Sequence, residues 1–442
     1  MCLINFPSAY GLTAKTANSI YGYAPEFINT KIASDKHGFT LNGVFYSEST
    51  GNIKEGEVKE FDGNLTFAHF VVKLFSYQSL DKQKNYQDVD GDNIDPVQPF
   101  LITVTSSQWF DANGVKIPDK DKNKIIGCGS GYPMPLRLEI SNQVQTFSQY
   151  GIPRKSDFVT LKKVYQIAAK PELCSVKPND IVLSPRTQWR TYDAAITSPV
   201  SGPWEWNGAN TTPNSKHGGG YSADFIPNMG FKINPTVSTA KFPATGFPGA
   251  KFQLLMSGAQ RDYSYSIVAN PGNNVSIDAM GFVTLKGKPT GDGKVTVRAT
   301  LIRNKAVKFD YSFNPTTIWL EPQKKPAVNF SSAQNICGGV GNLPLRKHLT
   351  SSPANSVGPN WDIYPNSFSR AIGGGVMGEW GWLAGNYPES NWESGNSYYV
   401  FYWTQEVDWA AYNIYFTVNY SGYVAHKEAD ATSNYYRAAC RR

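Results

Sequence analysis

The chain has 442 residues, which is enough for about three domains of ordinary size. Aromatic residues make up 14% of it, and they are accompanied by 39 glycines and 28 prolines. This composition is typical of β-rich proteins with many tight turns. The net charge of +7 comes from Lys and Arg scattered among 35 acidic residues, and the densest basic stretch, 119–124, is mixed in sign. A nucleic-acid-binding protein needs a basic stripe, so this class is excluded.

Residues 1–182 predict a first β-rich region. Strands are expected at 38–46, 65–76, 100–106, 134–140 and 158–167. Asn-Gly and Asp-Gly pairs between apolar runs supply the turns. Residues 183–240 are rich in aromatic and turn-forming residues, so they predict a loop-rich connecting segment that carries Trp189, Trp204 and Trp206.

An acidic loop lies inside the first region. Its carboxylates are Asp88, Asp90, Asp92 and Asp95. Several oxygens from one short turn are what Ca²⁺ prefers. An EF-hand loop has Gly at its sixth position and Glu at its twelfth, whereas this loop has Asn93 and Pro99 there. We therefore expect a solvated acidic turn, with a structural Ca²⁺ site as the alternative and no other cofactor.

Residues 241–322 predict a β-sandwich. Short alternating segments occur at 275–281, 282–285, 293–299 and 309–313. They are separated by turn signals at intervals of roughly ten residues, which is the spacing of strands in a sandwich.

The chain contains five cysteines. They are Cys2, Cys128, Cys174, Cys337 and Cys440. None forms a CxxC pair, so zinc and thioredoxin chemistry are not supported. Their wide spacing in β-rich sequence predicts Cys128–Cys174 and Cys337–Cys440 disulfides, with Cys2 left over. Buried free thiols in a reducing compartment are the alternative, and the composition favours the oxidised form.

Two patterns carry a resemblance to known adhesins. V-x-I-D-x-x-G-x-V-T at 275–284, followed by G-x-V-T-V-R-A at 293–299, resembles the bacterial Ig-like domains of surface adhesins. The segments 127–133, 170–174, 218–227 and 241–247 resemble the intimin/invasin group of outer-membrane adhesins. The resemblance implies a mostly β protein, an elongated string of Ig-like β-sandwich domains beginning with the region 1–182. It would end in an α+β C-type-lectin-like module at 323–442.

The same resemblance assigns parts to the terminal module. Ala333 and Cys337 would lie on its first helix, and Cys337 would pair with the last cysteine, Cys440. The later sheet would come from 380–382, 402–403 and 415–418. The calcium-binding triplets of sugar-binding C-type lectins do not occur between the two cysteines, so this module is expected to recognise protein.

Four residues of the module are candidates for receptor contact. They are Tyr387, Trp392, Asp408 and Trp409. Tyr387 and Trp392 are flanked by Gly, Asn and Ser, and Trp409 adjoins Asp408. Tyr and Trp offer large rigid contact areas, although a core position is an equal alternative for the three aromatic residues. Trp380 and Trp403 are expected in the core.

Neither a signal peptide nor a transmembrane helix is predicted. Residues 1–6 lack a basic segment and a long apolar core, and the most apolar run, 67–75, is short. We therefore expect the extracellular passenger region of a cell-surface or outer-membrane adhesin, whose leader and anchor are not in this chain. It would attach bacteria to a host cell-surface protein or glycan.

An enzyme is not expected, and no catalytic residue is nominated, because no Gly-x-Ser-x-Gly motif occurs. The alternative function is a secreted carbohydrate-active enzyme or sugar-binding protein with Ig-like accessory domains. Trp189, Trp204 and Trp206 would then be stacking platforms for sugar rings.

Overall fold

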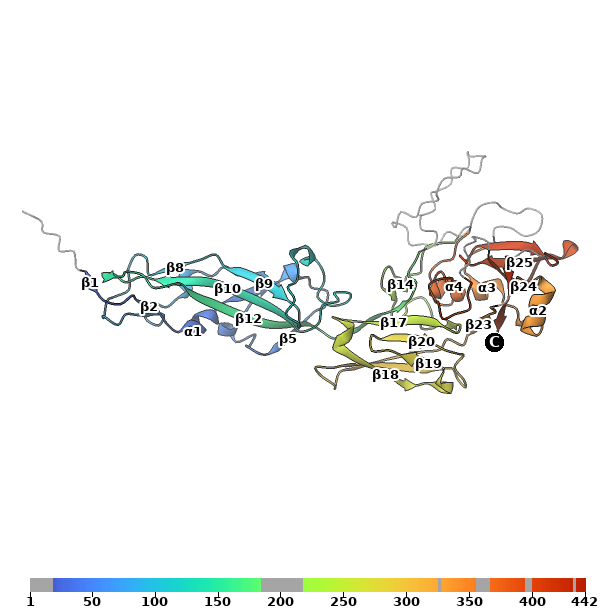
Figure 1. Cartoon of the computed structure of the whole chain (residues 1–442), viewed down its shortest axis with the longest axis horizontal. Coiled ribbons are helices and arrows are strands. Elements are labelled where there is room, and N and C mark those ends of the chain that lie inside the picture. Colours follow the sequence, from blue (N-terminus) through green and yellow to red (C-terminus); the bar gives the residue numbers. More distant parts are fainter. Residues whose placement is uncertain (1–18, 184–217, 325–326, 355–365, 394–399, 432–434) are drawn as a thin grey trace, which may run out of the picture. The chain divides into compact units, whose positions relative to one another are not determined.

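The computed structural model describes residues 19–183, 218–324, 327–354, 366–393, 400–431 and 435–442. This described part is mostly β-structure, as the sequence predicts (Figure 1). It divides into two compact units. Unit 1 contains the described residues up to Phe61 together with Leu65–Lys124 and Met134–Ala168. Unit 2 contains Asp62–Asn64, Ile125–Pro133 and the described residues from Ala169 onward.

Two long antiparallel strands form the centre of unit 1, β10 (Leu136–Thr146) and β12 (Val159–Ala169) (Figure 1). They pair from Leu136–Ile167 to Val144–Val159. Buried side chains alternate along both strands because one face of the sheet packs on the core. The sheet has the order β5-β12-β10-β8, with β9 also on β10. The three added strands are β5 (Val58–Phe61), β8 (Phe100–Ile102) and β9 (Ser106–Phe110).

Smaller sheets surround this one. Their elements are β1 (Ile20–Tyr21) on β11 (Gly151–Ile152), β2 (Glu26–Phe27) on β7 (Tyr86–Gln87), β3 (Gly38–Leu41) between β4 (Val44–Ser47) and β6 (Val71–Val72), and the helix α1 (Thr30–Ser34). The single strand expected at 38–46 is a hairpin, because Asn42 and Gly43 turn the chain with φ of 50° and 79°. Of the strand expected at 65–76, only β6 forms.

Aromatic rings fill part of the core of unit 1. Phe39 is fully buried, and its ring lies within 6.2 Å of the rings of Tyr46, Phe61, Phe70 and Tyr165. The rings come from β3, β4, β5 and β12 and from the segment before β6. Edge-to-face and stacked arrangements of this kind stabilise a core beyond their buried area, so they fix how the small sheet packs on the large one.

A buried lysine on β12 pairs with three acidic residues from the segment 35–55. Lys163 Nζ lies 2.7 Å from Asp35, 2.8 Å from Glu48 and 3.1 Å from Glu55. Burial alone would lower the pKa of Lys163, but the three carboxylates outweigh it and raise this pKa. The three carboxylates could otherwise hold a cation, and here the ammonium group satisfies them.

The sandwich of unit 2 has two sheets. One has the order β14-β15-β13-β17-β20-β19 and the other β18-β21-β22. The strands are β13 (Leu173–Pro178), β14 (Phe225–Ile226), β15 (Gly230–Phe231), β17 (Ala250–Met256), β18 (Tyr263–Ala269), β19 (Val275–Ile277), β20 (Phe282–Leu285), β21 (Val295–Leu301) and β22 (Lys308–Phe313). Burial alternates along β17 and β21, so each buries one face in an Ig-like core.

The rest of unit 2 is α+β. Its elements are β16 (Thr245–Gly246), β23 (Ile318–Pro322), α2 (Phe330–Cys337), α3 (Arg346–Leu349), α4 (Gly375–Trp380), β24 (Phe401–Trp409), β25 (Ile414–Asn419), β26 (Val424–Glu428), β27 (Tyr436–Arg437) and β28 (Ala439–Arg441). The sheets have the orders β26-β25-β24-β27 and β16-β23-β28. The C-type-lectin-like assignment stays a prediction.

We call the described residues of 327–442 the terminal part of unit 2, and two predicted placements there have clear outcomes. Ala333 and Cys337 lie on α2, the first helix of this part, as the resemblance implies. Trp380, assigned there to the later sheet, ends the helix α4 instead. Its segment is helical because the glycines on both sides allow the turns into and out of it, with φ of 71° at Gly375 and 79° at Gly381. Trp380 is nonetheless fully buried, as expected for a core residue.

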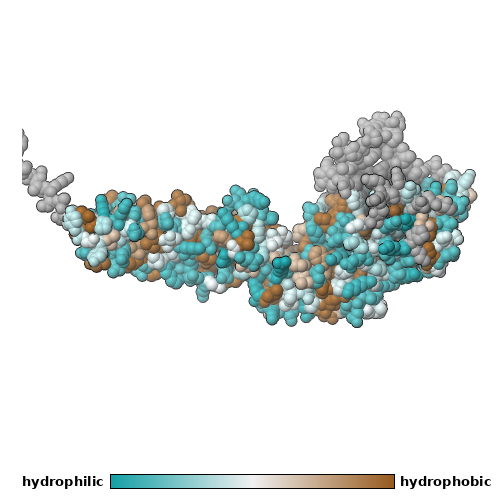
Figure 2. All heavy atoms as spheres, viewed as in Figure 1, coloured by the Kyte–Doolittle hydropathy of each residue, from teal (hydrophilic) through white to brown (hydrophobic). Residues whose placement is uncertain are grey.

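Figure 2 shows hydrophobic residues in small groups among hydrophilic ones on the viewed face. No helix within the described ranges is long and apolar enough to cross a membrane.

Lys163 tests the acidic cluster of unit 1. Lys163→Met removes the buried counter-charge of the three carboxylates and leaves them with the exposed Lys31, which lies 3.4 Å from Asp35 and from Glu55. We therefore expect the free energy of unfolding of unit 1 to fall by about 1–3 kcal/mol. Urea unfolding followed by the fluorescence of Trp109, the only tryptophan in this unit, measures it. Lys162→Met is the matched control, because the half-exposed Lys162 pairs with Glu139 at the surface. Equal stability of the two variants would contradict the role of Lys163.

Candidate functional site

A disulfide between Cys337 and Cys440 ties the start of the terminal part of unit 2 to its end. Its Cα atoms are 5.2 Å apart, and both residues are buried. Cys337 ends α2, and Cys440 lies on β28, which pairs with β23 at Glu321. The strand β23 is also the last strand before the terminal part. The β23–β28 pairing therefore brings the end of this part next to its start, and the disulfide links the same two ends covalently.

A buried carboxylate joins α4 to the segment between β15 and β17. Glu379 of α4 is fully buried and accepts hydrogen bonds from the N–H of Ala244 and Thr245, the hydroxyl of Thr245 and the N–H of Gly373. Burial raises its pKa to about 7, although the donors act in the opposite direction. Next to it, Trp380 Nε1 donates to Thr245 O at 3.1 Å. These contacts fix α4 against the segment that leads into β16.

Three of the four predicted contact residues are buried, and for Tyr387 and Trp392 this is the core position that the sequence left as an equal alternative. Tyr387 is 2% exposed, and its hydroxyl donates to Trp380 O at 2.7 Å. Trp392 is 5% exposed, and its ring packs edge-on against Tyr402 and Phe247. Their Gly- and Asn-rich surroundings suggest a surface loop, but tertiary packing against the sandwich turns both rings inward.

Asp408 is also unavailable for direct contact, because its carboxylate is fully buried and pairs with His426 Nδ1. Asp408 lies on β24 and His426 on β26, on either side of β25. This pair connects three strands directly beneath the end of the β24–β25 hairpin. Asp408 therefore supports the surface above it.

Trp409 is the one candidate that reaches the surface. It is half-buried, and its ring centroid lies 4.1 Å from that of Tyr412, which is 62% exposed. Val407, 46% exposed, lies two residues before Trp409 on the same strand. The pairing of β24 with β25 shifts register on both sides of Val407, and bulges of this kind re-aim side chains. We call Val407, Trp409 and Tyr412 the hairpin patch.

Sequence reasoning missed Tyr412 and Val407. A signal for Tyr412 was present in Asn413, because Asn favours the left-handed turn that ends this hairpin, with φ of 54°. The exposure of Val407 depends on the two register shifts between β24 and β25, and no local sequence pattern predicts these shifts.

The acidic loop of unit 1 does not bring its carboxylates together. Within the described residues, Asp88, Asp90, Asp92 and Asp95 form no cluster of cation ligands. Asp88 accepts from the N–H of Asp90, Asp90 from that of Tyr23, and Asp92 from that of Tyr150. Asp95 pairs with Arg154. Backbone donors and an arginine bond to several of these oxygens, and the calcium alternative stays a prediction.

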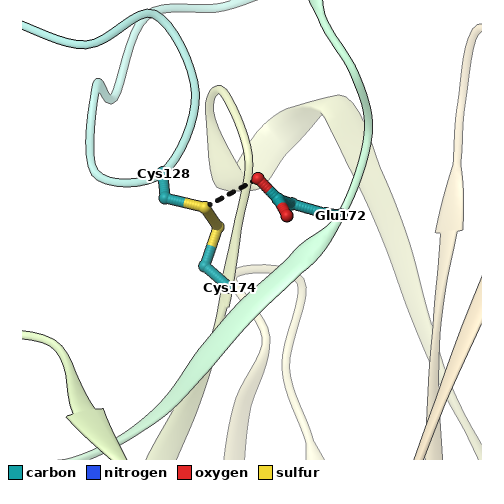
Figure 3. A group of neighbouring side chains, drawn as sticks. All are labelled: Cys128, Glu172 and Cys174. Atoms are coloured by element: carbon teal, nitrogen blue, oxygen red, sulfur yellow. Dashed lines mark hydrogen bonds between the residues drawn. A yellow bond between two sulfur atoms is a disulfide. The ribbon is translucent and has the colours of Figure 1, made fainter. Parts of the chain in front are cut away.

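A second disulfide joins Cys128 and Cys174, with Cα atoms 5.8 Å apart (Figure 3). Glu172 Oε1 lies 3.2 Å from Cys128 Sγ. A cystine sulfur carries no proton, so this approach is a polar contact and not a donated hydrogen bond. The three side chains have the spacing of a metal site, but the disulfide removes both thiolates that would bind a metal.

The aromatic residues named for the carbohydrate alternative, Trp189, Trp204 and Trp206, lie outside the described residues.

Residues 227–313 match the family model described as invasin, domain 4. This match confirms the resemblance to intimin/invasin-type adhesins that the sequence indicates. No curated protein matches the chain.

Three solved structures are similar. Invasin, a bacterial integrin-binding protein, is 17% identical with a TM-score of 0.35, and 80% of this chain and 54% of that chain are covered. An intimin mutant of EHEC O157:H7 is 19% identical with a TM-score of 0.30, over 46% of this chain and 89% of that one. A C-terminal intimin fragment in complex with the intimin-binding domain of the translocated intimin receptor is 13% identical with a TM-score of 0.32, over 78% and 86%. The chain thus spans 54% of the invasin chain that it matches.

Replacing both Cys337 and Cys440 by Ser should destabilise the terminal part. The bridge closes a loop of 103 residues, and loop-closure entropy of this size corresponds to about 4–5 kcal/mol. We expect limited proteolysis to cut the double variant within 327–442 at protease concentrations that leave the wild type intact. The control is the double Ser variant of Cys128 and Cys174, whose bridge lies outside that part. Identical digestion patterns would contradict the prediction.

The lowered pKa of His348 predicts that the stability of unit 2 depends on pH. Burial, followed by Arg441 and Lys347, lowers its pKa to about 4, whereas an unfolded histidine has a pKa of about 6.5. As pH falls, the unfolded chain binds this proton first. The stability that neutral His348 supports is therefore present above pH 6.5 and is lost towards pH 4, by up to about 3 kcal/mol. Glu379 acts in the opposite direction, because its raised pKa adds stability below pH 7.

The difference between the wild type and His348→Gln isolates this effect. Urea unfolding of unit 2 from pH 7 to pH 4 should show a smaller loss of stability for His348→Gln. His69→Gln, at an exposed position of unit 1, is the control and should follow the wild type. A constant difference between the wild type and His348→Gln at every pH would rule out His348 as the titrating group.

Proposed function

We propose that this chain, an intimin/invasin-type adhesin by its match over 227–313, is the extracellular passenger of a bacterial cell-surface protein that binds a host receptor through the terminal part of unit 2. The family match is the observation that carries the proposal. Two disulfides agree with it, since such bonds persist in oxidising compartments outside the cytoplasm.

The hairpin patch is the proposed contact surface. Trp409 and Tyr412 present adjacent rings at the end of β24, and interface anchors are enriched in these two residue types. The Asp408–His426 pair and the neighbouring strands hold the hairpin in place, which lowers the entropy cost of binding. The chain acts by binding and not by catalysis, and its receptor is a protein or a glycan, of which we favour a protein.

The rigid support of this surface includes the sandwich. One hydrophobic core runs from Val176 of β13 through Phe252 and Trp380 to Ala439 of β28. The terminal part therefore shares its core with the sandwich, and residues 323–442 alone would expose apolar side chains. For this reason the full chain is the protein to use in binding experiments.

Attachment to cells tests the proposal. Beads coated with the full chain should bind cultured epithelial cells, and the double variant Trp409→Ser/Tyr412→Ser should lose at least tenfold in bound beads. Tyr77→Ser is the control, because Tyr77 is an equally exposed aromatic residue, 53%, in unit 1. Unchanged binding of the double variant would contradict the role of the hairpin patch. A failure of wild-type beads to bind cells would contradict the proposed function.

A further inference from the structure

A cleft of 480 Å³ lies beside α3 in the terminal part of unit 2. Arg346 and Lys347 of α3 and Glu406 of β24 line it, together with three apolar residues, Leu345, Pro353 and Ala354. The hydroxyl-bearing residues Thr350, Ser351 and Ser352 line it as well. The hairpin patch is separate from these residues, although Glu406 and Val407 are neighbours on β24.

The guanidinium group of Arg346 is held rigidly at the cleft. Its Nε lies 3.3 Å from Glu406 Oε1, and the other oxygen of this carboxylate accepts the backbone N–H of Arg346. The guanidinium carbon lies 4.0 Å from the centroid of Phe416, in a cation–π contact. Arg346 is thus fixed from one edge and from one face, before any ligand arrives.

The other edge of this guanidinium is available. Within the described residues, the two Nη atoms of Arg346 make no hydrogen bond, since its side chain bonds through Nε alone. An arginine fork with two parallel N–H donors matches the two oxygens of a carboxylate. Lys347 is exposed and adds a second positive charge. Among the described residues of the lining, Glu406 supplies the only negative charge, so this part of the cleft has an excess of positive charge.

The hydroxyls of Thr350 and Ser351 donate to the carbonyls of Gly422 and Ser369. Their protons are therefore not available to a carboxylate, and Arg346 and Lys347 must supply the donors. Aromatic rings, on which sugar rings pack, do not occur among the described residues of the lining. The ring of Phe416 is covered by Arg346 itself. These features favour an acidic side chain of a protein over a sugar.

We propose that this cleft, which we call the arginine cleft, receives an Asp or Glu side chain of the protein partner and pairs it with Arg346 and Lys347. The inference rests on the proposed function and adds the chemistry of the partner. The arginine cleft supplies charge and orientation, and the hairpin patch supplies apolar area. Charged contacts at the edge of an interface mainly accelerate association and select the partner.

A peptide titration tests the cleft without cells. The probe is a fluorescein-labelled Gly-Asp-Glu-Asp-Gly peptide, titrated with the full chain and followed by fluorescence anisotropy at 50 mM NaCl. Millimolar binding is expected, and it should weaken at least fivefold at 500 mM NaCl because salt screens the charges. The neutral peptide Gly-Asn-Gln-Asn-Gly should not bind. Equal binding of both peptides, or none of the acidic one, overturns the proposal.

Variants locate the site. Lys347→Glu and Arg346→Lys should each weaken the acidic peptide at least fivefold, the second because lysine keeps the charge and loses the fork. Lys294→Glu makes the same charge change at an exposed position of the sandwich and should bind as the wild type. Thermal unfolding checks that Arg346→Lys still folds, and Lys347→Glu changes only an exposed side chain. Unchanged binding by Lys347→Glu overturns the assignment.

Two further outcomes separate the cleft from the proposed function. Sialyllactose, a sugar that carries a carboxylate, serves as a competitor, and its binding in place of the acidic peptide would overturn the protein partner in favour of a glycan. In the bead assay, Lys347→Glu should reduce bound beads about fivefold. If both cleft variants bind cells as the wild type does and the hairpin-patch variant does not, the proposed function is supported and the role of the cleft is contradicted.

Discussion

The continuity of the hydrophobic core in unit 2 is the constraint on which the proposed binding surfaces depend. Phe242 and Phe252 of the sandwich lie in one set of ring contacts with Trp380 of the terminal part, at centroid distances of 4.9 and 6.2 Å. Burial of rings of this size is a large stabilising term. The sandwich is therefore part of the body that positions the hairpin patch and the arginine cleft, and not a detachable spacer.

Polar contacts inside this core restrict how the two parts can pack. The carboxylate of Glu379 needs donors once it is buried, because an unsatisfied buried charge costs several kcal/mol. Ala244, Thr245 and Gly373 supply them only in one arrangement of α4 and the segment before β16. A shift of the terminal part would leave this carboxylate without partners. The disulfide of Cys337 and Cys440 adds a covalent restraint at the opposite end of the same part.

The chemistry of the hairpin patch suits it to supply binding energy, and the chemistry of the arginine cleft suits it to supply charge and orientation. Trp409 and Tyr412 offer area with few rotatable bonds, and such residues dominate binding energy. Arg346 offers a charged fork that is held by Glu406 and Phe416, so little further order is needed on binding. Both surfaces are carried by β24 and the elements packed on it, which means that one receptor could contact them together.

The sequence by itself determined the β-rich class and the alternating strands of the sandwich, because side-chain alternation and turn residues act over a few neighbouring residues. The helix with Ala333 and Cys337 was implied by the family resemblance, and the two cysteine pairs were predicted from their wide spacing. The tertiary structure decided which aromatic residues face solvent. Tyr387 and Trp392 turn inward because the sandwich packs against them, and Asp408 is buried because His426 pairs with it from another strand. Only the three-dimensional arrangement left Trp409 and Tyr412 at the surface and fixed Arg346 at a cleft, since burial and charge balance depend on residues far apart in the chain.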